Sequence, residues 1–500
     1  SYDTTTVTGP TRTEIYKHFG YSAAPAAGGN ATNGVWKIGL LLEKAVGSQQ
    51  ESYSWSGQLI SDIKDGGYTE RPKYDPDTYA PLLIQKTIRR DGTDYTTNYG
   101  SFDNYGNPGA LNESGNATRN TTLTYYNNST NWVIGQKDQE TLSGGGTIDR
   151  TFDTQGRITR ESRYGVTTDY TYHTDGAIRT RTDANGNTTT YLDYYRGIAR
   201  DERRPENVNI RRTVDAAGNV TSYTDGRGNT TALGWDNLHR LTSINFPSGH
   251  TDVTISYDGR GNKTLTRGGL RKTRAVDGFG RTSWIERGGI VTDIAYDALG
   301  QKIFESYPGS AAGTTHSYDA LGRVTFVRHG DGDSRSHTYS AGNTVRVTNE
   351  RGLNTTSTYL AYGDPEDSVL IGITDPVRMT AIARNLLGQV TSVTQNGKTR
   401  SYGYNSQKYL TSLTNPETGT TYFGRDSLGN MTSRRVSSSG TTSFSYDGLN
   451  RLIYINYPAT EDASFSYDAN GNLLAANNSL TSWSGTYDAR NKPLTERLVM

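Results

Sequence analysis

Short stretches of alternating apolar and polar residues recur along most of the chain. Clear examples are "RVTFV" at 323–327 and "RLIYINYP" at 451–458. Alternation with a period of two indicates β-strands that bury one face and expose the other. Strict alternation predicts two same-face groups: Val324 with Phe326, and Leu452 with Tyr454 and Asn456.

A turn motif, Tyr-Asp-x-x-Gly-Arg/Asn, precedes many of these strands, as in "SYDALGRVTFVRHG" at 317–330. Asp at the first position accepts local backbone N–H groups in a type I turn, and Gly three residues later adopts positive φ. The first positions fall at Asp153, His173, Tyr194, Asp215, Asp236, Asp258, Asp277, Asp297, Asp319, Ser340, Leu360, Asn385, Asn405, Asp426, Asp447, Asp468 and Asp488. The Gly position holds another residue at His239, Lys408, Asn450 and Asn491.

The motif returns every ~21 residues, which is typical of repeat proteins. Weaker turns of the form D-x-x-G-N-x-T lie midway between the main ones, at 183–189 and 225–231. One repeat is therefore a β-hairpin of two short strands and two turns. A lone hairpin is marginally stable in water, but a stacked array gives every interior strand two neighbours. The sequence therefore predicts an all-β fold made of one long, continuous sheet. Because sheets twist and large aliphatic residues are few, we expect this sheet to coil into a hollow form.

The amino-acid composition argues against several classes of function. The chain of 500 residues has no cysteine, which excludes disulfides, thiolate nucleophiles and cysteine metal sites. Its 52 Lys and Arg balance 51 Asp and Glu, so the chain lacks the excess of positive charge that is typical of nucleic-acid-binding proteins. The longest apolar run, near 39–46, is far too short to span a bilayer, so no membrane span is expected. The 57 Gly and 35 Tyr fit many tight turns and aromatic strand faces rather than disorder.

The N-terminal part is less regular than the rest. We divide the chain into an irregular β-rich part, 1–95, and repeats over 96–500 that are clear from residue 151. Pro and Gly interrupt the pattern within 21–34 and 74–83. The segment 36–46 is interpreted as a strand plus a turn, with a short helix as the alternative. The stretches "SFDNYGNPG" (101–109) and "TTLTYYNNSTNWVIGQ" (121–136) predict a degenerate repeat turn and a strand–turn–strand unit, respectively.

The motif, its period and the interspersed turns resemble the YD-repeat, or RHS-repeat, proteins, and 121–136 and 414–458 resemble their bacterial toxin-associated branch. This resemblance implies a spiralling β-sheet that forms a hollow shell, or cocoon, or part of one. It implies encapsulation of a C-terminal toxic cargo, which the remaining shell and core segment help to enclose. It also implies export to the bacterial surface or medium and delivery by type VI secretion or Tc-type machinery.

One departure from the family pattern concerns the autoprotease core that closes many such shells. The Asp-Pro pairs at Asp364 and Asp375 lack the following Gly of the DPxG-type motif. We therefore expect the core, its cleavage site and the toxin to lie outside this sequence, as in a segment of a longer protein. No catalytic, cofactor-binding or metal-binding residue is assigned, and the chain is not expected to be an enzyme.

Two other functions compete with the shell. Exposed Tyr and Trp stripes could make the chain a cell-surface adhesin that binds glycans. A patch of His316, His329 and His337 with nearby Tyr and Arg could support polysaccharide β-elimination, although ordinary strand and loop roles explain these residues more simply. Among them, only His329 has no place in the repeat pattern. The segment "HGDGDS" (329–334) lacks the Gly and Glu that a calcium loop requires.

Overall fold

The computed structural model describes residues 2–8, 12–19, 39–59, 79–459 and 461–500. All regular structure in these ranges is β-strand, which confirms the predicted all-β class. The strands fall into two compact units. Unit 1 comprises Ser1–Arg157, Ile294–Tyr307 and Ala311–Thr399, and unit 2 comprises Ile158–Asp293, Pro308–Ser310 and Arg400–Met500.

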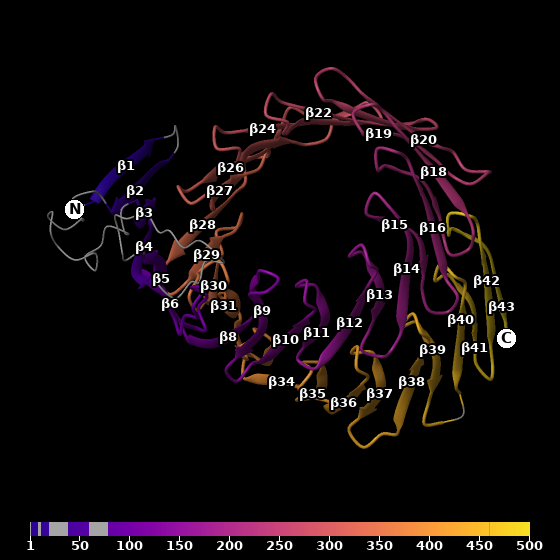
Figure 1. Ribbon diagram of the computed structural model, residues 1–500. Coiled ribbons are helices and arrows are strands. Elements are labelled where there is room, and N and C mark those ends of the chain that lie inside the picture. Colours follow the sequence, from indigo (N-terminus) through magenta and orange to yellow (C-terminus); the bar gives the residue numbers. More distant parts are fainter. Residues whose placement is uncertain (1, 9–11, 20–38, 60–78, 460) are drawn as a thin grey trace. The chain divides into compact units, whose positions relative to one another are not determined.

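Unit 1 contains an earlier run and a later run of strands (Figure 1). The earlier run is β1 (Tyr2–Thr8), β2 (Thr13–Phe19), β3 (Leu41–Val46), β4 (Gln49–Leu59), β5 (Tyr79–Arg90), β6 (Thr93–Gly100), β7 (Ala110–Ser114), β8 (Thr118–Asn128), β9 (Val133–Leu142) and β10 (Gly146–Phe152). The later run begins within β24 (Ile290–Tyr296) and continues with β25 (Lys302–Ser306), β26 (Gly313–Tyr318), β27 (Val324–Arg328), β28 (Ser334–Ser340), β29 (Thr344–Thr348), β30 (Asn354–Leu360), β31 (Val369–Thr374), β32 (Met379–Arg384) and β33 (Val390–Gln395).

Unit 2 has the same organisation. Its earlier run is β11 (Ile158–Arg163), β12 (Val166–Tyr172), β13 (Ile178–Thr182), β14 (Thr188–Tyr195), β15 (Ile198–Arg203), β16 (Asn209–Val214), β17 (Val220–Thr224), β18 (Thr230–Trp235), β19 (Leu241–Asn245), β20 (Val253–Tyr257), β21 (Lys263–Arg267), β22 (Leu270–Val276) and β23 (Thr282–Arg287). The later run comprises most of β34 (Lys398–Tyr404), then β35 (Leu410–Asn415), β36 (Gly419–Arg425), β37 (Met431–Val436), β38 (Thr441–Tyr446), β39 (Leu452–Asn456), β40 (Ala463–Tyr467), β41 (Leu473–Asn477), β42 (Ser482–Tyr487) and β43 (Pro493–Val499).

Within each run, a strand pairs antiparallel with the strand that follows it in the sequence. Examples are β4 with β5 in unit 1 and β17 with β18 in unit 2. Successive hairpins therefore extend the sheet one after another, as the period predicted. One strand face carries aromatic and aliphatic side chains that are half-buried, whereas the other is polar and exposed, as in β40 with Phe465 and Tyr467 against Ser464 and Ser466.

Fourteen of the seventeen predicted turns form as expected, and Asp319 shows their geometry. The Gly322 N–H donates to the Asp319 carbonyl at 3.0 Å, and the Asp319 N–H donates to the Arg323 carbonyl at 2.9 Å. Gly322 has a φ of 80°, so the turn is a type I turn closed by a left-handed residue. The predicted substitutes at the Gly position all adopt positive φ: His239 (59°), Lys408 (68°), Asn450 (61°) and Asn491 (62°).

Three predicted turn positions differ, and each has a local reason. Tyr194 lies inside β14, because the chain reverses two residues later through Arg196 and Gly197, both with positive φ. Ser340 ends β28 and is followed by a three-residue loop with positive φ at Gly342 and Asn343. Leu360 precedes the longer loop that holds the inserted Asp-Pro segment before β31.

Strict alternation after the turn proves wrong in β39 and β27, because a β-bulge follows most of the main turns, although none follows the turn at Asp258. In β39, Leu452 pairs with Tyr446, yet Tyr454 pairs with the neighbouring residue Ser445. Ile453 is thus an extra residue, which forms a β-bulge. Because of it, Leu452 and Tyr454 point to opposite faces of the sheet although they are two residues apart. Leu452 lies on the face of Ile455, away from Tyr454 and Asn456.

The same shift occurs in β27. There Val324 pairs with Tyr318 and Phe326 pairs with Ser317, so Val324 and Phe326 lie on opposite faces rather than on one. Phe326 is exposed as a consequence.

The irregular N-terminal part contains strands and turns of the same kind. Leu41–Val46 is a strand preceded by a turn, which confirms the strand interpretation over the described part of 36–46. Asp103 opens a repeat turn, with the Gly106 N–H 3.1 Å from its carbonyl, and β8 and β9 form the predicted strand–turn–strand unit. The interruption at 21–34 and the first half of that at 74–83 lie outside the described residues, whereas residues 79–83 belong to β5 and pair with β4 rather than interrupting the pattern. The division at residue 95 stays a prediction.

Candidate functional site

The side chain of the first turn residue organises the turn around itself. In the Asp236 turn, Oδ1 accepts the Leu238 and Arg240 N–H groups at 2.9 and 3.0 Å, and Oδ2 accepts Arg240 Nε at 2.8 Å. The Arg240 side-chain hydrogen bond, together with these backbone bonds, holds the pKa of Asp236 below its ordinary value. In the Asp215 turn, the Asn219 side chain takes the place of Arg and likewise lowers the pKa of Asp215. This explains why the motif ends in Arg or Asn.

The Arg also connects one repeat to the next. The guanidinium of Arg240 lies over the ring of Tyr257, one repeat later, at 4.2 Å from the ring centroid. Arg323 lies over Tyr339 at 4.1 Å in the same way. The Tyr257 hydroxyl donates to the Leu241 carbonyl at 3.1 Å, next to the bulge that follows the preceding turn. The bulge interrupts the ladder of backbone hydrogen bonds between the strands. At this interruption the Tyr hydroxyl supplies a donor to a backbone carbonyl.

In unit 1, turns of the earlier run contact turns of the later run along a line that we call the unit 1 seam. Asp91, in the turn between β5 and β6, accepts two hydrogen bonds from the Arg323 guanidinium, at 2.5 and 3.1 Å. Burial raises the pKa of Asp91, but hydrogen bonds from Arg323 and Ser48 bring it below its ordinary value. The Gly342 N–H donates to Thr93 Oγ1 at 2.8 Å. These partners lie more than two hundred residues apart in the sequence.

The most buried side chains of unit 1 lie at the same seam. Ile88, Tyr95 and Ala361 form a core cluster with exposed fractions of 3%, 1% and 0%. The Asn116 N–H donates to the Ala361 carbonyl at 3.1 Å, which adds a backbone hydrogen bond between the two runs. A Cβ on Gly115 would lie 2.2 Å from a backbone oxygen of the later run, so this position accepts no side chain. The seam is therefore closely packed.

Unit 2 has a corresponding unit 2 seam, and Figure 1 shows its later run, in yellow, beside the earlier run, in magenta. Arg227 is central to it. Its Nη1 donates to the Asp488 carbonyl at 2.8 Å, its Nη2 donates to the Tyr487 carbonyl at 3.1 Å, and its Nε lies 3.3 Å from Asp468 Oδ2. Asn470 Nδ2 donates to Asp225 Oδ2 at 2.7 Å. Two rows of turns therefore join through side chains and turn carbonyls rather than through a strand ladder.

The three histidines have ordinary structural surroundings. His316 in β26 stacks on Tyr318 at 6.5 Å between ring centroids, and His337 lies in β28. Burial lowers the pKa of both imidazoles, and the Nδ1 atoms of both are buried with no hydrogen-bond partner in the part of the chain that the structure describes. His329 occupies the first position of a midway turn, since the Gly332 N–H donates to its carbonyl at 3.0 Å. The repeat pattern thus accounts for His329 as well, and its Nε2 lies 3.3 Å from Glu350 Oε1.

Within the described ranges, no three His, Asp or Glu side chains gather closely enough to hold a metal ion. The same ranges contain no helix of the length and apolar character that crossing a membrane requires. The feature with the most specific side-chain chemistry is therefore the pair of seams. Sequence reasoning missed them, because their contacts join residues 232 to 276 positions apart, far beyond the hairpin period. The residues of the turn give no signal, since the same Asp-Gly-Arg-Gly-Asn sequence occurs at 225–229 in the seam and at 258–262, where a Cβ on Gly259 meets nothing within 4 Å.

Comparison with known families supports the repeat assignment. The family model RHS Repeat matches residues 214–251, which contain the turns at Asp215, Asp225 and Asp236. The match and the recurrence of the same turn from Asp103 to Asp488 confirm the predicted YD-repeat, or RHS-repeat, architecture. The search of curated proteins finds no match.

Solved structures share the fold at very low sequence identity. TcdB2-TccC3-Cdc42 matches with a TM-score of 0.59 at 9% identity, covering 96% of this chain and 39% of that one. TcdB2-TccC3-TEV matches with a TM-score of 0.52 at 8% identity, covering 98% of this chain and 46% of that one. TcdB2-TccC3 without its hypervariable C-terminal region matches with a TM-score of 0.51. The chain spans less than half the length of these structures, and the similarity establishes a common fold.

Proposed function

We propose that the chain forms part of the wall of a toxin-associated shell that encloses and protects a polypeptide cargo. The observation that carries the proposal is the seam in each unit, where the turn rows of two runs of hairpins meet. Polar groups of these turns bond to the other run and are therefore not open to solvent or to foreign chains. Fold similarity to TcdB2-TccC3 structures, one of them described as lacking a hypervariable C-terminal region, supports the same role.

The mechanism is steric. A wall of hydrogen-bonded hairpins with packed seams keeps proteases from whatever lies behind it, because cleavage requires local opening of the sheet. In this proposal the partners are a toxic cargo, the rest of the shell and other toxin components, and the protein works outside the producing cell. The route of export stays a prediction.

Limited proteolysis of the protein encoded by the complete gene tests this proposal. We expect mass spectrometry to find a protected segment outside the 500 residues of this chain, and we expect that segment to become cleavable in an Arg227→Ala variant, which weakens a seam. A Phe279→Ala variant, changed at an exposed turn, is the matched control and keeps the protection. Equal cleavage of every segment outside the chain in the unmodified protein would contradict the proposal.

A further inference from the structure

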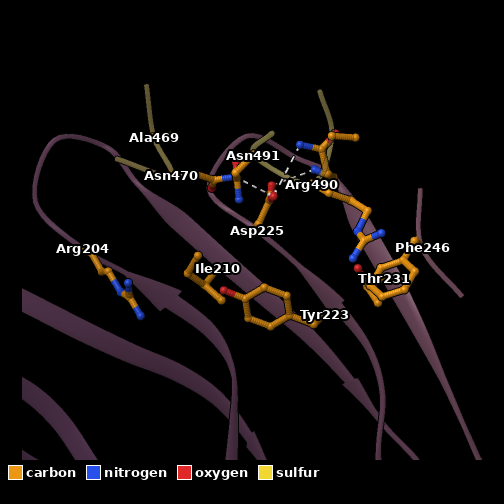
Figure 2. Close-up of a pocket in the computed structure, with 12 residues that line it drawn as sticks. Arg204, Ile210, Tyr223, Asp225, Thr231, Phe246, Ala469, Asn470, Arg490 and Asn491 are labelled. Atoms are coloured by element: carbon orange, nitrogen blue, oxygen red, sulfur yellow. Dashed lines mark hydrogen bonds between the residues drawn. The ribbon is translucent and has the colours of Figure 1, made fainter. Parts of the chain in front are cut away.

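A pocket opens at the unit 2 seam, beneath the turns of the later run (Figure 2). Its volume is about 370 Å³, within the range of small-ligand sites. Tyr223 in β17 and Phe246 just after β19 come from the earlier run, whereas Asn470, Arg490 and Asn491 come from turns of the later run. The pocket therefore exists only where the two runs meet.

Tyr223 and Phe246 lie along one face of the sheet. Tyr223 pairs across the strands with Arg212 on one side and Thr231 on the other. Figure 2 shows the Tyr223 ring pointing toward Ile210, and Phe246 at the opposite end beside Thr231. Two aromatic rings with apolar faces and small polar groups between them suit a saturated ring that presents C–H groups on its faces and hydroxyl groups at its edge.

The guanidinium of Arg490 enters this pocket with an unused donor. Its carbon lies 3.9 Å from the centroid of the Phe246 ring, and its Nη1 is buried with no hydrogen-bond partner among the described residues. The two other arginines near this site are paired. Arg204 Nε donates to Glu202 at 2.6 Å, and Arg227 donates to carbonyls of the seam. Arg490 is half-buried and stays charged, and its buried Nη1 donor without an acceptor is unfavourable, so this position suits a ligand that brings an anionic oxygen.

The amides at the rim add further selectivity. Asn470 Nδ2 is held by Asp225 Oδ2 at 2.7 Å and by Asn491 Oδ1 at 3.0 Å. Asn491 Oδ1 also accepts from Asn472 at 2.7 Å, which orients the Asn491 amide. The Asn491 side chain is thereby fixed beside Arg490 (Figure 2). Fixed amides next to a guanidinium provide directed hydrogen bonding of the kind that recognises hydroxyl and carboxylate groups together.

We propose that this pocket binds an acidic sugar, with Arg490 holding the carboxylate of a uronate residue between Tyr223 and Phe246. The aromatic rings favour a sugar ring over an aliphatic acidic side chain, and the planar fork of Arg490 favours a carboxylate over a neutral sugar. The site would give the chain an affinity for acidic polysaccharide that is independent of the proposed shell role.

Isothermal titration calorimetry of the protein with tetragalacturonate tests this inference, with galactotetraose and tetraglutamate as comparison ligands. We expect one saturable site for tetragalacturonate, with at least tenfold weaker binding of either comparison ligand. Arg490→Gln should weaken binding of tetragalacturonate at least tenfold, whereas Arg497→Gln, at an exposed position of β43, should leave it unchanged.

Three results would overturn the proposal: no binding of tetragalacturonate, equal binding by the Arg490→Gln variant, or binding of tetraglutamate as tight as that of the sugar. If Arg490→Gln fails to fold, Arg490→Lys retains the charge but loses the fork, and Phe246→Leu retains an apolar side chain but loses the ring. Each should weaken sugar binding severalfold. Unchanged binding in both folded variants would also overturn it.

Discussion

The turns at Asp225 and Asp277 have the same local geometry but different surroundings. Each closes with a Gly N–H donating to the Asp carbonyl at 3.0 Å, and each has Gly at the second position. At the third position the first turn has Arg227, which binds the later run, whereas the second has Phe279, which is 86% exposed. The turn itself is thus encoded locally, whereas its neighbours are not: the turn at Asp258 also has Gly and Arg at its second and third positions, yet a Cβ on Gly259 meets nothing within 4 Å.

The largest expected effect comes from the third residue. Arg227→Ala removes two hydrogen bonds to turn carbonyls and an ion pair with Asp468, and we expect a loss of about 2–4 kcal/mol in unfolding free energy. Phe279→Ala, at an exposed position, should change stability by less than about 0.5 kcal/mol. Chemical denaturation monitored by circular dichroism measures both. Equal losses in the two variants would remove the distinction between seam turns and other turns.

The second residue provides a smaller, steric test. A Cβ on Gly226 would lie 2.7 Å from the Ala469 carbonyl oxygen and 2.9 Å from Val208 Cγ1, whereas a Cβ on Gly278 meets nothing within 4 Å. We expect Gly226→Ala to cost about 1–3 kcal/mol because the later run must shift. Gly278→Ala should be neutral or stabilise by up to about 1 kcal/mol, since Ala restricts the unfolded chain. Thermal unfolding measures the stability of both variants. A Gly226→Ala variant as stable as the wild type would show that the seam is not packed closely.

A substitution at the unit 1 seam tests whether the charge of Asp91 contributes to the stability of the seam. Asn accepts the positive φ of 48° at position 91, so Asp91→Asn removes the charge without disturbing the turn. We expect a loss of about 1–2 kcal/mol at pH 7 from weakening the bonds to Arg323.

The pH dependence of the same variant sharpens the test. The folded pKa of Asp91 is lowered, so its stabilisation is present above the unfolded pKa and is lost as the pH falls below about 4. The difference in melting temperature between the wild type and Asp91→Asn should therefore shrink from pH 7 to pH 2. A difference that is constant across this range would mean that the Asp91 charge is not involved.

The smallest expected effect concerns the link between successive repeats. Tyr467→Phe loses the hydrogen bond from the hydroxyl to the Leu452 carbonyl at 2.8 Å but keeps the ring under Arg451. We expect a loss of about 0.5–1.5 kcal/mol. Tyr422→Phe, at a ring that is 46% exposed, is the control and should have little effect. Urea titration of the two variants compares them, and equal stabilities would show that the hydroxyl is not needed at the bulge.

The sequence predicted the turns, which depend on neighbouring residues, but did not predict the contacts between distant parts of the chain. The spacing of Asp and Gly predicts the turns even where His239 or Asn450 replaces Gly, because these positions require only a positive φ. Alternation failed at Leu452 and Val324, because a bulge adds a residue without any mark in the sequence. The seams and the Arg490 pocket depend on contacts between distant repeats, and no period of about 21 residues encodes which repeats meet.

The close approach of the two runs in unit 1 is the central claim, and a disulfide tests it most directly because the chain has no cysteine. A Cβ on Gly92 would lie 3.8 Å from Ala341 Cβ, the separation that a disulfide requires. We expect Gly92→Cys with Ala341→Cys to form an intramolecular disulfide under mild oxidation, detected as a linked peptide by mass spectrometry. Gly352→Cys with Ala341→Cys, both within unit 1, is the control and should stay reduced, since nothing lies within 4 Å of a Cβ on Gly352. Two reactive thiols that never link residues 92 and 341 would contradict the account.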